Sequence, residues 1–234
     1  PDFLRASLES DRGLQFAEDG TPDGPRQQQQ RHYYRLIEGL DASVGKLLAE
    51  LQSRGLLENT VILFTSDNGH FLGEHGFFGK WLMHEESIRV PLIIAGPAPL
   101  VGKHAQACDE MALNIDIAPT ALDLAGIPIP ATMQGRSLLP QLQQPTRPLR
   151  ESFFYEHLYE HHPKPPRHIE PCEGVRTRDW KYITYIKRKG PGSEALFDLK
   201  KDPHETTNVV PDPFYTPRLV DMRERAETFR RSLR

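Results

Sequence analysis

The chain has 234 residues, of which 38% are hydrophobic and 26% are charged, and its net charge is −3. This composition indicates a soluble globular protein rather than a disordered one, and no basic patch favours nucleic acid. The longest apolar runs are only as long as strands, so the sequence offers no membrane span. The two cysteines, Cys108 and Cys172, are too few for a disulfide scaffold or a cysteine-based zinc site, and we expect two free thiols.

The chain is expected to begin with a loop and a long helix. Residues 1–30 are polar and rich in Gly and Pro, which indicates a loop or an arm. Apolar residues at three- and four-residue spacing predict an amphipathic helix over residues 31–54. Gly55 is placed to end this helix.

Two apolar runs predict strands. VILFTS (61–66) and PLIIAG (91–96) are continuous and short, as in strands that are buried on both faces. Asp116 is expected to cap a helix that runs to Leu124 and that Gly126 closes. This order of helices and strands indicates an α/β layer with a largely parallel sheet.

The pattern changes near residue 150. GVRTRDWKYITYIKR (174–188) alternates around an Arg-Asp turn, which predicts a hairpin or an edge strand, and ALFDL (195–199) predicts another strand. A helix is expected from about Pro217. We therefore predict two parts: residues 1–150 in the α/β layer, and residues 151–234 in a small antiparallel subdomain with a terminal helix.

A polar cluster follows the first predicted strand, in TSDNGHFLGEHGFFGKW (65–81). In α/β sheets ligands bind at the carboxyl ends of strands, where Asp67 and Asn68 lie. A carboxylate beside an amide oxygen suits calcium or magnesium, and Lys80 adds a positive charge for an anionic substrate. The alternative is an ordinary S-D-N-G turn, with His70 and His75 as surface residues. On these residues alone the turn is the more common arrangement.

A wider pattern favours the site. The run TSDNGHFLGEHGFFGKWLMHEESIRVPLII resembles the sulfatase family of the alkaline-phosphatase-like superfamily. The preceding RLIEGLDASVGKLLAELQSRGLLENTVILF and the later NIDIAPTALDLAGIPIP, QGRSLLP, GVRTRDWKYI and ALFDLKKDPHETTNVV resemble further family segments in the same order. The resemblance implies the C-terminal part of a three-layer α/β fold, followed by the small antiparallel subdomain.

The resemblance also implies roles for individual residues. Asp67 and Asn68 would be metal ligands, for calcium or alternatively magnesium. Lys80 would contact the sulfate and the bridging ester oxygen. His70 would border the sulfate pocket, and His75 would support that pocket or face the substrate.

Two other residues in this run are expected to be structural. Glu85 and Arg89 would hold the loop and the following strand together by buried or partly buried pairing.

A second segment is the best candidate for substrate specificity. FFYEHLYEHHPKPPRHIEP (153–171) is rich in aromatic and basic residues and resembles a segment of bacterial sulfatases related to N-acetylglucosamine-6-sulfatase and the mucin-desulfating enzymes. Its candidates for binding a sulfated sugar are His157 and His168, with Tyr155 and His162 beside them. The alternative is a solvated loop without contact to substrate.

The nucleophile that the resemblance implies is absent. Sulfatases use a formylglycine made from Cys or Ser in a C/S-x-P-S/A-R motif, and neither QACDEM nor EPCEGV fits that motif. The acidic pair expected near a sulfatase N-terminus is also missing. We therefore expect the C-terminal portion of a sulfatase, inactive alone, whose partner is the missing N-terminal part of the catalytic domain.

The implied reaction of the intact protein is hydrolysis of a sulfate ester of a carbohydrate, dependent on a metal and formylglycine. The alternatives are a phosphoester or phosphonate hydrolase of the same superfamily, or a relative that binds sulfated glycan without cleaving it. The compartment stays open, although relatives act in the periplasm, outside the cell or in lysosomes.

Overall fold

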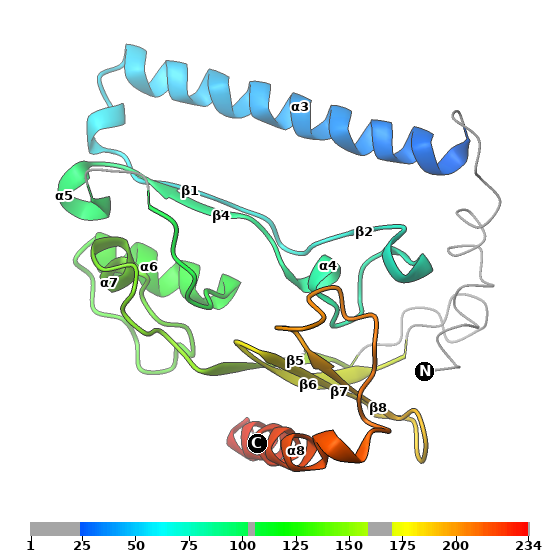
Figure 1. Cartoon of the computed structure of the whole chain (residues 1–234). Coiled ribbons are helices and arrows are strands. Elements are labelled where there is room, and N and C mark those ends of the chain that lie inside the picture. Colours follow the sequence, from blue (N-terminus) through cyan, green and yellow to red (C-terminus); the bar gives the residue numbers. More distant parts are fainter. Residues whose placement is uncertain (1–23, 103–105, 159–169, 234) are drawn as a thin grey trace. The chain divides into compact units, whose positions relative to one another are not determined.

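A computed structural model describes residues 24–102, 106–158 and 170–233 (Figure 1). These residues form two compact units. The first comprises the described residues up to Tyr33, residues 68–89 and the chain from Ser152 onward, and the second comprises residues 34–67 and 90–151. Among the described residues, no helix has both the length and the apolar character that crossing a bilayer requires.

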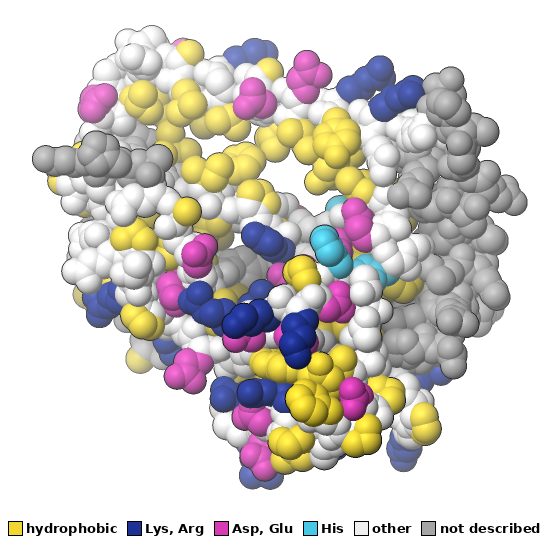
Figure 2. Space-filling view, viewed as in Figure 1, with side chains coloured by type: hydrophobic (Ala, Val, Ile, Leu, Met, Phe, Trp, Pro, Cys, Tyr) yellow, Lys and Arg dark blue, Asp and Glu magenta, His cyan; other side chains and the backbone are white. Residues whose placement is uncertain are grey.

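The long predicted helix is confirmed as α3, Pro25–Ser53, which begins earlier than expected. Gly55 follows with a φ of 66°, and the Leu56 amide donates to the carbonyl of Leu51, as at many helix ends. Several apolar side chains of α3 are exposed, and Figure 2 shows hydrophobic side chains along this helix. They include Leu36, Ile37, Leu40 and Leu47. The apolar stripe that predicted the helix is thus exposed in part, while Val44, Leu48 and Leu51 are half-buried.

The two predicted strands are β1, Ile62–Thr65, and β4, Leu92–Ala95. The expectation of a parallel pairing is wrong for them, because they run antiparallel, with Ile62 opposite Ala95. Parallel neighbours need a crossover that packs on the sheet, whereas residues 68–89 between these strands belong to the other unit. Both strands are also less buried than predicted, since every second residue of β4 is exposed.

Short helices complete the second unit. They are η1 Leu57–Asn59, α5 Ala98–Val101, η3 Asn114–Asp116, α6 Ile117–Leu124 and α7 Leu139–Gln143. The predicted helix to Leu124 is confirmed as α6, and Gly126 follows it with a left-handed φ of 69°.

Asp116 precedes α6, but the prediction that its side chain caps the helix is wrong. The buried carboxylate accepts the backbone N–H groups of Leu113 and Arg136, each at 2.8 Å. It also accepts two N–H groups of Arg150, at 2.7 and 2.6 Å. A bidentate ion pair therefore replaces the cap and joins the start of α6 to the end of this unit.

The predicted antiparallel subdomain is present in the first unit as a four-stranded sheet in the order β5-β6-β7-β8, with antiparallel neighbours. Its strands are β5 Ser152–His157, β6 Cys172–Thr177, β7 Trp180–Tyr185 and β8 Glu194–Asp198. After the short turn η4, Pro213–Tyr215, the terminal helix α8 spans Thr216–Ser232, as predicted.

The two faces of this sheet bury different partners, because side chains alternate along each strand. Val175, Tyr182 and Leu196 pack against Leu219 and Met222 of α8 on one face. The other face has a buried cluster of Met83, Cys172, Ile183, Tyr185, Ala195, Phe197 and Leu199. Met83 belongs to residues 68–89, so the segment that carries Asn68 and Lys80 rests on the C-terminal sheet.

Both cysteines are free thiols, as expected: Cys108 is exposed and Cys172 is buried. Burial raises the pKa of the Cys172 thiol to about 12, which keeps it protonated and unreactive in the core.

Candidate functional site

A small hairpin brings the end of the polar cluster back to its start. β2, Phe71–Leu72, pairs with β3, Phe78–Gly79, in antiparallel register. The turn η2, Glu74–Gly76, joins them, and α4, Glu85–Ile88, follows β3 after a short connection. Because the hairpin reverses the chain, Lys80 returns to the neighbourhood of Asn68, twelve residues earlier.

The Lys80 ammonium contacts the Asn68 side chain directly. Lys80 Nζ donates to Asn68 Oδ1 at 2.6 Å, and Asn68 Nδ2 donates to the carbonyl of Gly69 at 2.8 Å. These two bonds orient the amide with its oxygen toward the positive charge. Asp67 precedes Asn68 in the sequence and is exposed.

The chain immediately after Asn68 is held closely against α4. The Gly69 amide donates to the carbonyl of Ser87 at 2.8 Å. A Cβ at Gly69 would lie 2.1 Å from the carbonyl oxygen of Glu86, which is backbone and cannot turn aside. Glycine is therefore required here for space.

We expect Gly69→Ala to destabilise the chain by about 1–3 kcal/mol, because the added methyl group forces α4 away from the loop. Urea unfolding measures this change. Gly45→Ala is the matched control, since nothing lies within 4 Å of its Cβ and alanine is the better helix former by roughly 0.5–1 kcal/mol. Equal effects of the two substitutions would show that the close contact at Gly69 is not required.

Trp81 is a site residue that the sequence reasoning missed. Its ring centroid lies 5.0 Å from Lys80 Nζ and 5.5 Å from the ring of His157, at the end of β5. The φ of Trp81 is 100°, a value that large side chains rarely adopt. The only signal in the sequence was its place next to Lys80.

Hydrogen bonds on both sides hold Trp81 in this conformation. Its amide donates to Ser87 Oγ at 3.0 Å, and the Tyr155 hydroxyl donates to its carbonyl at 3.2 Å. Burial raises the pKa of Tyr155, so this hydroxyl stays a donor. Tyr155 and His157 thus lie next to Trp81, whereas His162 and His168 lie outside the described residues.

His70 lies in an aromatic setting near Lys80. Its ring stacks on Tyr33 with centroids 6.1 Å apart and meets Phe78 edge-on at 4.7 Å. Burial, and then the charge of Lys80, lower the pKa of His70, while Glu74 opposes them. His70 therefore presents a neutral imidazole beside the lysine.

His75 makes its contacts within the loop. Its Nε2 lies 3.5 Å from Glu86 Oε2, and the bond to Glu86 raises the pKa of His75. Its ring is 4.7 Å from that of His84, which is buried among Phe71, Phe77 and Phe197. Burial lowers the pKa of His84 to about 3. These contacts stabilise the loop, and contact between His75 and a substrate stays a prediction.

The expected structural role of Glu85 is confirmed. Its Oε1 lies 2.7 Å from Lys181 Nζ and 3.3 Å from Arg176 Nε. Burial raises the pKa of Glu85, but Lys181 and Arg176 outweigh burial and lower it overall. The expected pairing of Arg89 is wrong, because its side chain is exposed and forms no ion pair with any described residue.

The side chains at the strand end fit part of a hard-cation site. Asp67 and Asn68 offer a carboxylate and an amide oxygen, which suit calcium, an ion that takes about six to eight oxygen ligands. Within the described ranges, no group of three or more His, Cys, Asp or Glu side chains could hold a metal ion.

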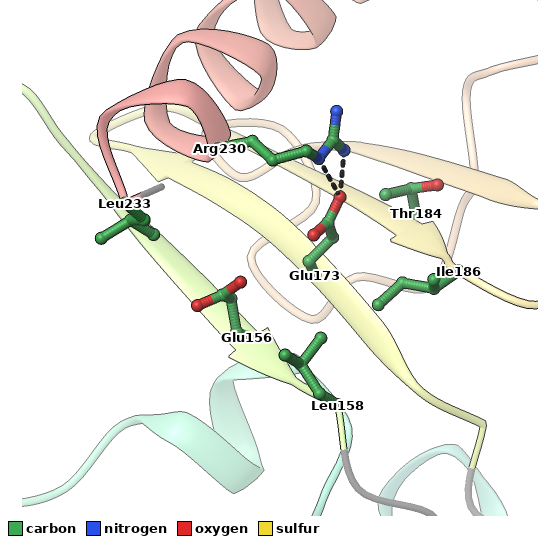
Figure 3. A pocket seen from close by; sticks show the side chains of 7 residues that line it. All are labelled: Glu156, Leu158, Glu173, Thr184, Ile186, Arg230 and Leu233. Carbon is green, nitrogen blue, oxygen red and sulfur yellow. Dashed lines mark hydrogen bonds and ion pairs between the residues drawn. The ribbon is translucent and has the colours of Figure 1, made fainter.

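A cavity of about 470 Å³ lies elsewhere in the first unit (Figure 3). Its lining includes Glu156, Glu173 and Thr184 of the sheet and Arg230 and Leu233 at the C-terminal end of the chain. Arg230 points to Glu173, with Nε 2.8 Å from Oε1. None of the predicted site residues lines this cavity.

Two family models match the chain. The model described as "Sulfatase" matches residues 9–127, and the model described as "N-sulphoglucosamine sulphohydrolase, C-terminal" matches residues 73–232. An N-acetylglucosamine-6-O-sulfatase of Bacteroides thetaiotaomicron is 36% identical over 205 residues, which cover 86% of this chain and 35% of the relative. The chain thus spans about a third of the length of that relative.

Solved structures share the fold. A protein in complex with its substrate D-glucosamine-2-N,6-O-disulfate superposes with a TM-score of 0.78 at 33% identity, covering 88% of this chain and 41% of that one. The phosphonate monoester hydrolase of Agrobacterium radiobacter reaches 0.71 at 26% identity, covering 86% of this chain and 40% of that one. The resemblance is therefore confirmed: the chain belongs to the sulfatase family and has the C-terminal part of an alkaline-phosphatase-like fold, with its small antiparallel sheet and terminal helix.

Proposed function

We propose that this chain forms part of a sulfatase that removes sulfate from a sulfated carbohydrate, with Asp67, Asn68 and Lys80 at the reacting group. One observation carries the proposal. The Lys80 ammonium lies 2.6 Å from Asn68 Oδ1, at the end of a strand. A fixed positive charge beside an oxygen ligand for a hard cation suits an anion whose charge shifts during reaction.

Asp67 and Asn68 would hold calcium, with magnesium as the alternative ion. The orientation of the Asn68 amide supports this role, since its oxygen faces a cationic group and its NH₂ is bonded to Gly69. A bound ion supplies positive charge that polarises the sulfate oxygens. The other ligands would come from the substrate and from a part of the enzyme that precedes this chain.

Lys80 would bind the sulfate and the bridging oxygen. Its ammonium has three N–H donors, and one of them goes to Asn68. As the ester S–O bond breaks, negative charge grows on the leaving oxygen, and the ammonium offsets that charge. The face of Trp81 shields Lys80 on one side, which favours a direct contact with an anion over hydration.

A sulfated amino sugar is the proposed substrate class. The printed names of two matches support it: one is a curated N-acetylglucosamine-6-O-sulfatase, and one is a solved structure in complex with its substrate D-glucosamine-2-N,6-O-disulfate. Among the histidines, His70 and His157 lie beside the Lys80–Trp81 pair and are proposed to contact the sugar. His75 and His168 are proposed to contact the substrate as well.

The chain alone is expected to hydrolyse no sulfate ester. The C/S-x-P-S/A-R nucleophile motif is absent from its sequence. The exposed apolar face of α3 supports a partner that buries it, and we propose the preceding part of the catalytic domain as that partner. A generic aryl sulfate assay with and without calcium tests this expectation, and metal-dependent turnover by this chain would contradict it.

The substrate class is tested on a longer enzyme that contains this chain. Ion chromatography should detect sulfate release from D-glucosamine-2-N,6-O-disulfate, with slower or no turnover of a phosphonate monoester. The likeness to a phosphonate monoester hydrolase makes that activity the second candidate. Faster phosphonate hydrolysis would favour it, and binding of the sulfated sugar without any product would indicate a non-catalytic relative.

A further inference from the structure

A buried cluster of charges connects the C-terminal sheet to α4. Lys181 on β7 is fully buried, and its Nζ lies 2.7 Å from Glu85 Oε1 and 2.6 Å from Glu205 Oε1. Arg176, opposite Lys181 on β6, reaches the same oxygen of Glu85 with its Nε at 3.3 Å. Lys181 thus pairs with two carboxylates, and Arg176 shares one of them.

The members of this cluster depend on one another. Removing one partner of a buried ion pair leaves an uncompensated charge in a site with little water, which is far more costly than loss of a surface pair. Glu205 is itself 2% exposed and has a φ of 54°, a conformation that non-glycine residues keep only where their surroundings require it.

The cluster fixes the position of α4. Glu205 Oε2 accepts the backbone N–H of Glu85, the first residue of α4, at 2.7 Å. A helix of only four residues has too few internal hydrogen bonds to be stable alone. Contacts from the sheet must therefore hold α4 in place.

In turn, α4 contacts both sides of the candidate site through Ser87. The carbonyl of Ser87 accepts the N–H of Gly69, the residue after Asn68, at 2.8 Å. Its hydroxyl accepts the N–H of Trp81, the residue after Lys80, at 3.0 Å. One buried residue of α4 thus holds the two chain segments from which the Asn68 and Lys80 side chains meet.

We propose that Lys181 and Glu205 of the C-terminal subdomain are positioning residues that hold Asn68 and Lys80 in register by fixing α4. Neither touches the reacting atoms. The antiparallel sheet would then not only pack against its neighbours but also set the geometry of the proposed sulfate and metal site. The catalytic meaning of this inference rests on the proposed function, but the structural coupling does not.

Hydrogen exchange in the full 234-residue chain tests the coupling. Glu205→Gln keeps the shape of the side chain and an oxygen for the Glu85 amide, but removes the charge that faces Lys181. We expect the amides of Gly69 and Trp81 to exchange about tenfold faster or more, because loss of the buried pair frees α4. Both amides are informative, since they bond to Ser87 and not to Glu205.

Glu173→Gln is the matched control. Glu173 is also a buried carboxylate of this sheet in an ion pair, with Arg230, but it lies on β6 where Thr184 and not Lys181 is opposite. We expect Glu173→Gln to change the exchange rates of the Gly69 and Trp81 amides less than about threefold, when the variants are compared at equal global stability. If Glu205→Gln does not fold, Glu85→Gln removes the charge on the α4 side and is expected to give the same acceleration.

Unchanged exchange at Gly69 and Trp81 in these variants, or an equal acceleration in Glu173→Gln, would overturn the inference. The measurement needs neither calcium nor turnover. Failure to bind calcium or to hydrolyse a sulfate ester would therefore contradict the proposed function and leave the coupling intact. Unchanged hydrogen exchange would contradict the coupling and leave the proposed function intact.

Discussion

Lys80→Met in an intact sulfatase that contains this chain is expected to lower kcat about 10²–10³-fold. Removing one hydrogen-bond donor that stabilises negative charge in a transition state usually has an effect of this size. The substitution keeps an unbranched apolar side chain and removes the ammonium, which contacts Asn68 and lies over the Trp81 ring. Because Lys80 would bind the bridging oxygen as well as the sulfate, the loss should fall mainly on kcat rather than on KM. Steady-state kinetics with an aryl sulfate measures both constants.

Arg89→Ala is the control for this substitution. Arg89 is an exposed cation of the same segment and forms no ion pair with any described residue. We expect less than about a threefold change in kcat, because an exposed charge is screened by solvent. A similar loss in both variants would mean that general positive charge, and not the position of Lys80, supports turnover.

Asp116→Ala is expected to destabilise the chain by about 3–5 kcal/mol, the usual cost of breaking a buried ion pair from one side. The carboxylate is fully buried and accepts two bonds from Arg150, whose side chain is 7% exposed. The substitution also leaves the amides of Leu113 and Arg136 without this acceptor. Thermal unfolding should show a loss of roughly 6–20 °C in Tm, and urea unfolding should show the loss of free energy directly.

Asp221→Ala provides the comparison for Asp116. Asp221 pairs with Arg218 and Arg225 on the surface of α8, at helical spacing. Such pairs contribute little, so we expect a change within about 0.5 kcal/mol. If Asp116→Ala were as mild as this control, the buried network would not be holding the start of α6.

Periodicity made much of the fold predictable. The apolar residues of α3 recur at helical spacing, and the residues of β6 and β7 alternate between the two faces of the antiparallel sheet, which is the pattern that predicted each element. The pairing of β1 with β4 was not predictable in the same way. A short apolar run is equally compatible with parallel and antiparallel neighbours, and the direction depends on where the connection between the two strands folds.

The candidate site was partly predictable for a different reason. Asp67, Asn68 and Lys80 stand out because oxygen ligands and a lysine follow a strand, and the hairpin between them brings Lys80 to Asn68. The supporting cluster was not found, since KKDPHE reads as a solvated turn although Glu205 is buried in it. Lys181 did carry a signal: in WKYITY it shares one strand face with Ile183 and Tyr185, both of which are buried.

Calcium content is the most direct measure of the metal site. An intact sulfatase containing this chain should purify with about one calcium ion per molecule, and Asp67→Ala and Asn68→Ala should each retain less than roughly a tenth of it, because two of its few protein ligands lie there. Asn59→Ala, which removes an exposed amide from η1, should keep the full content. Full calcium occupancy in both site variants would contradict the proposal that the end of β1 binds the metal beside Lys80.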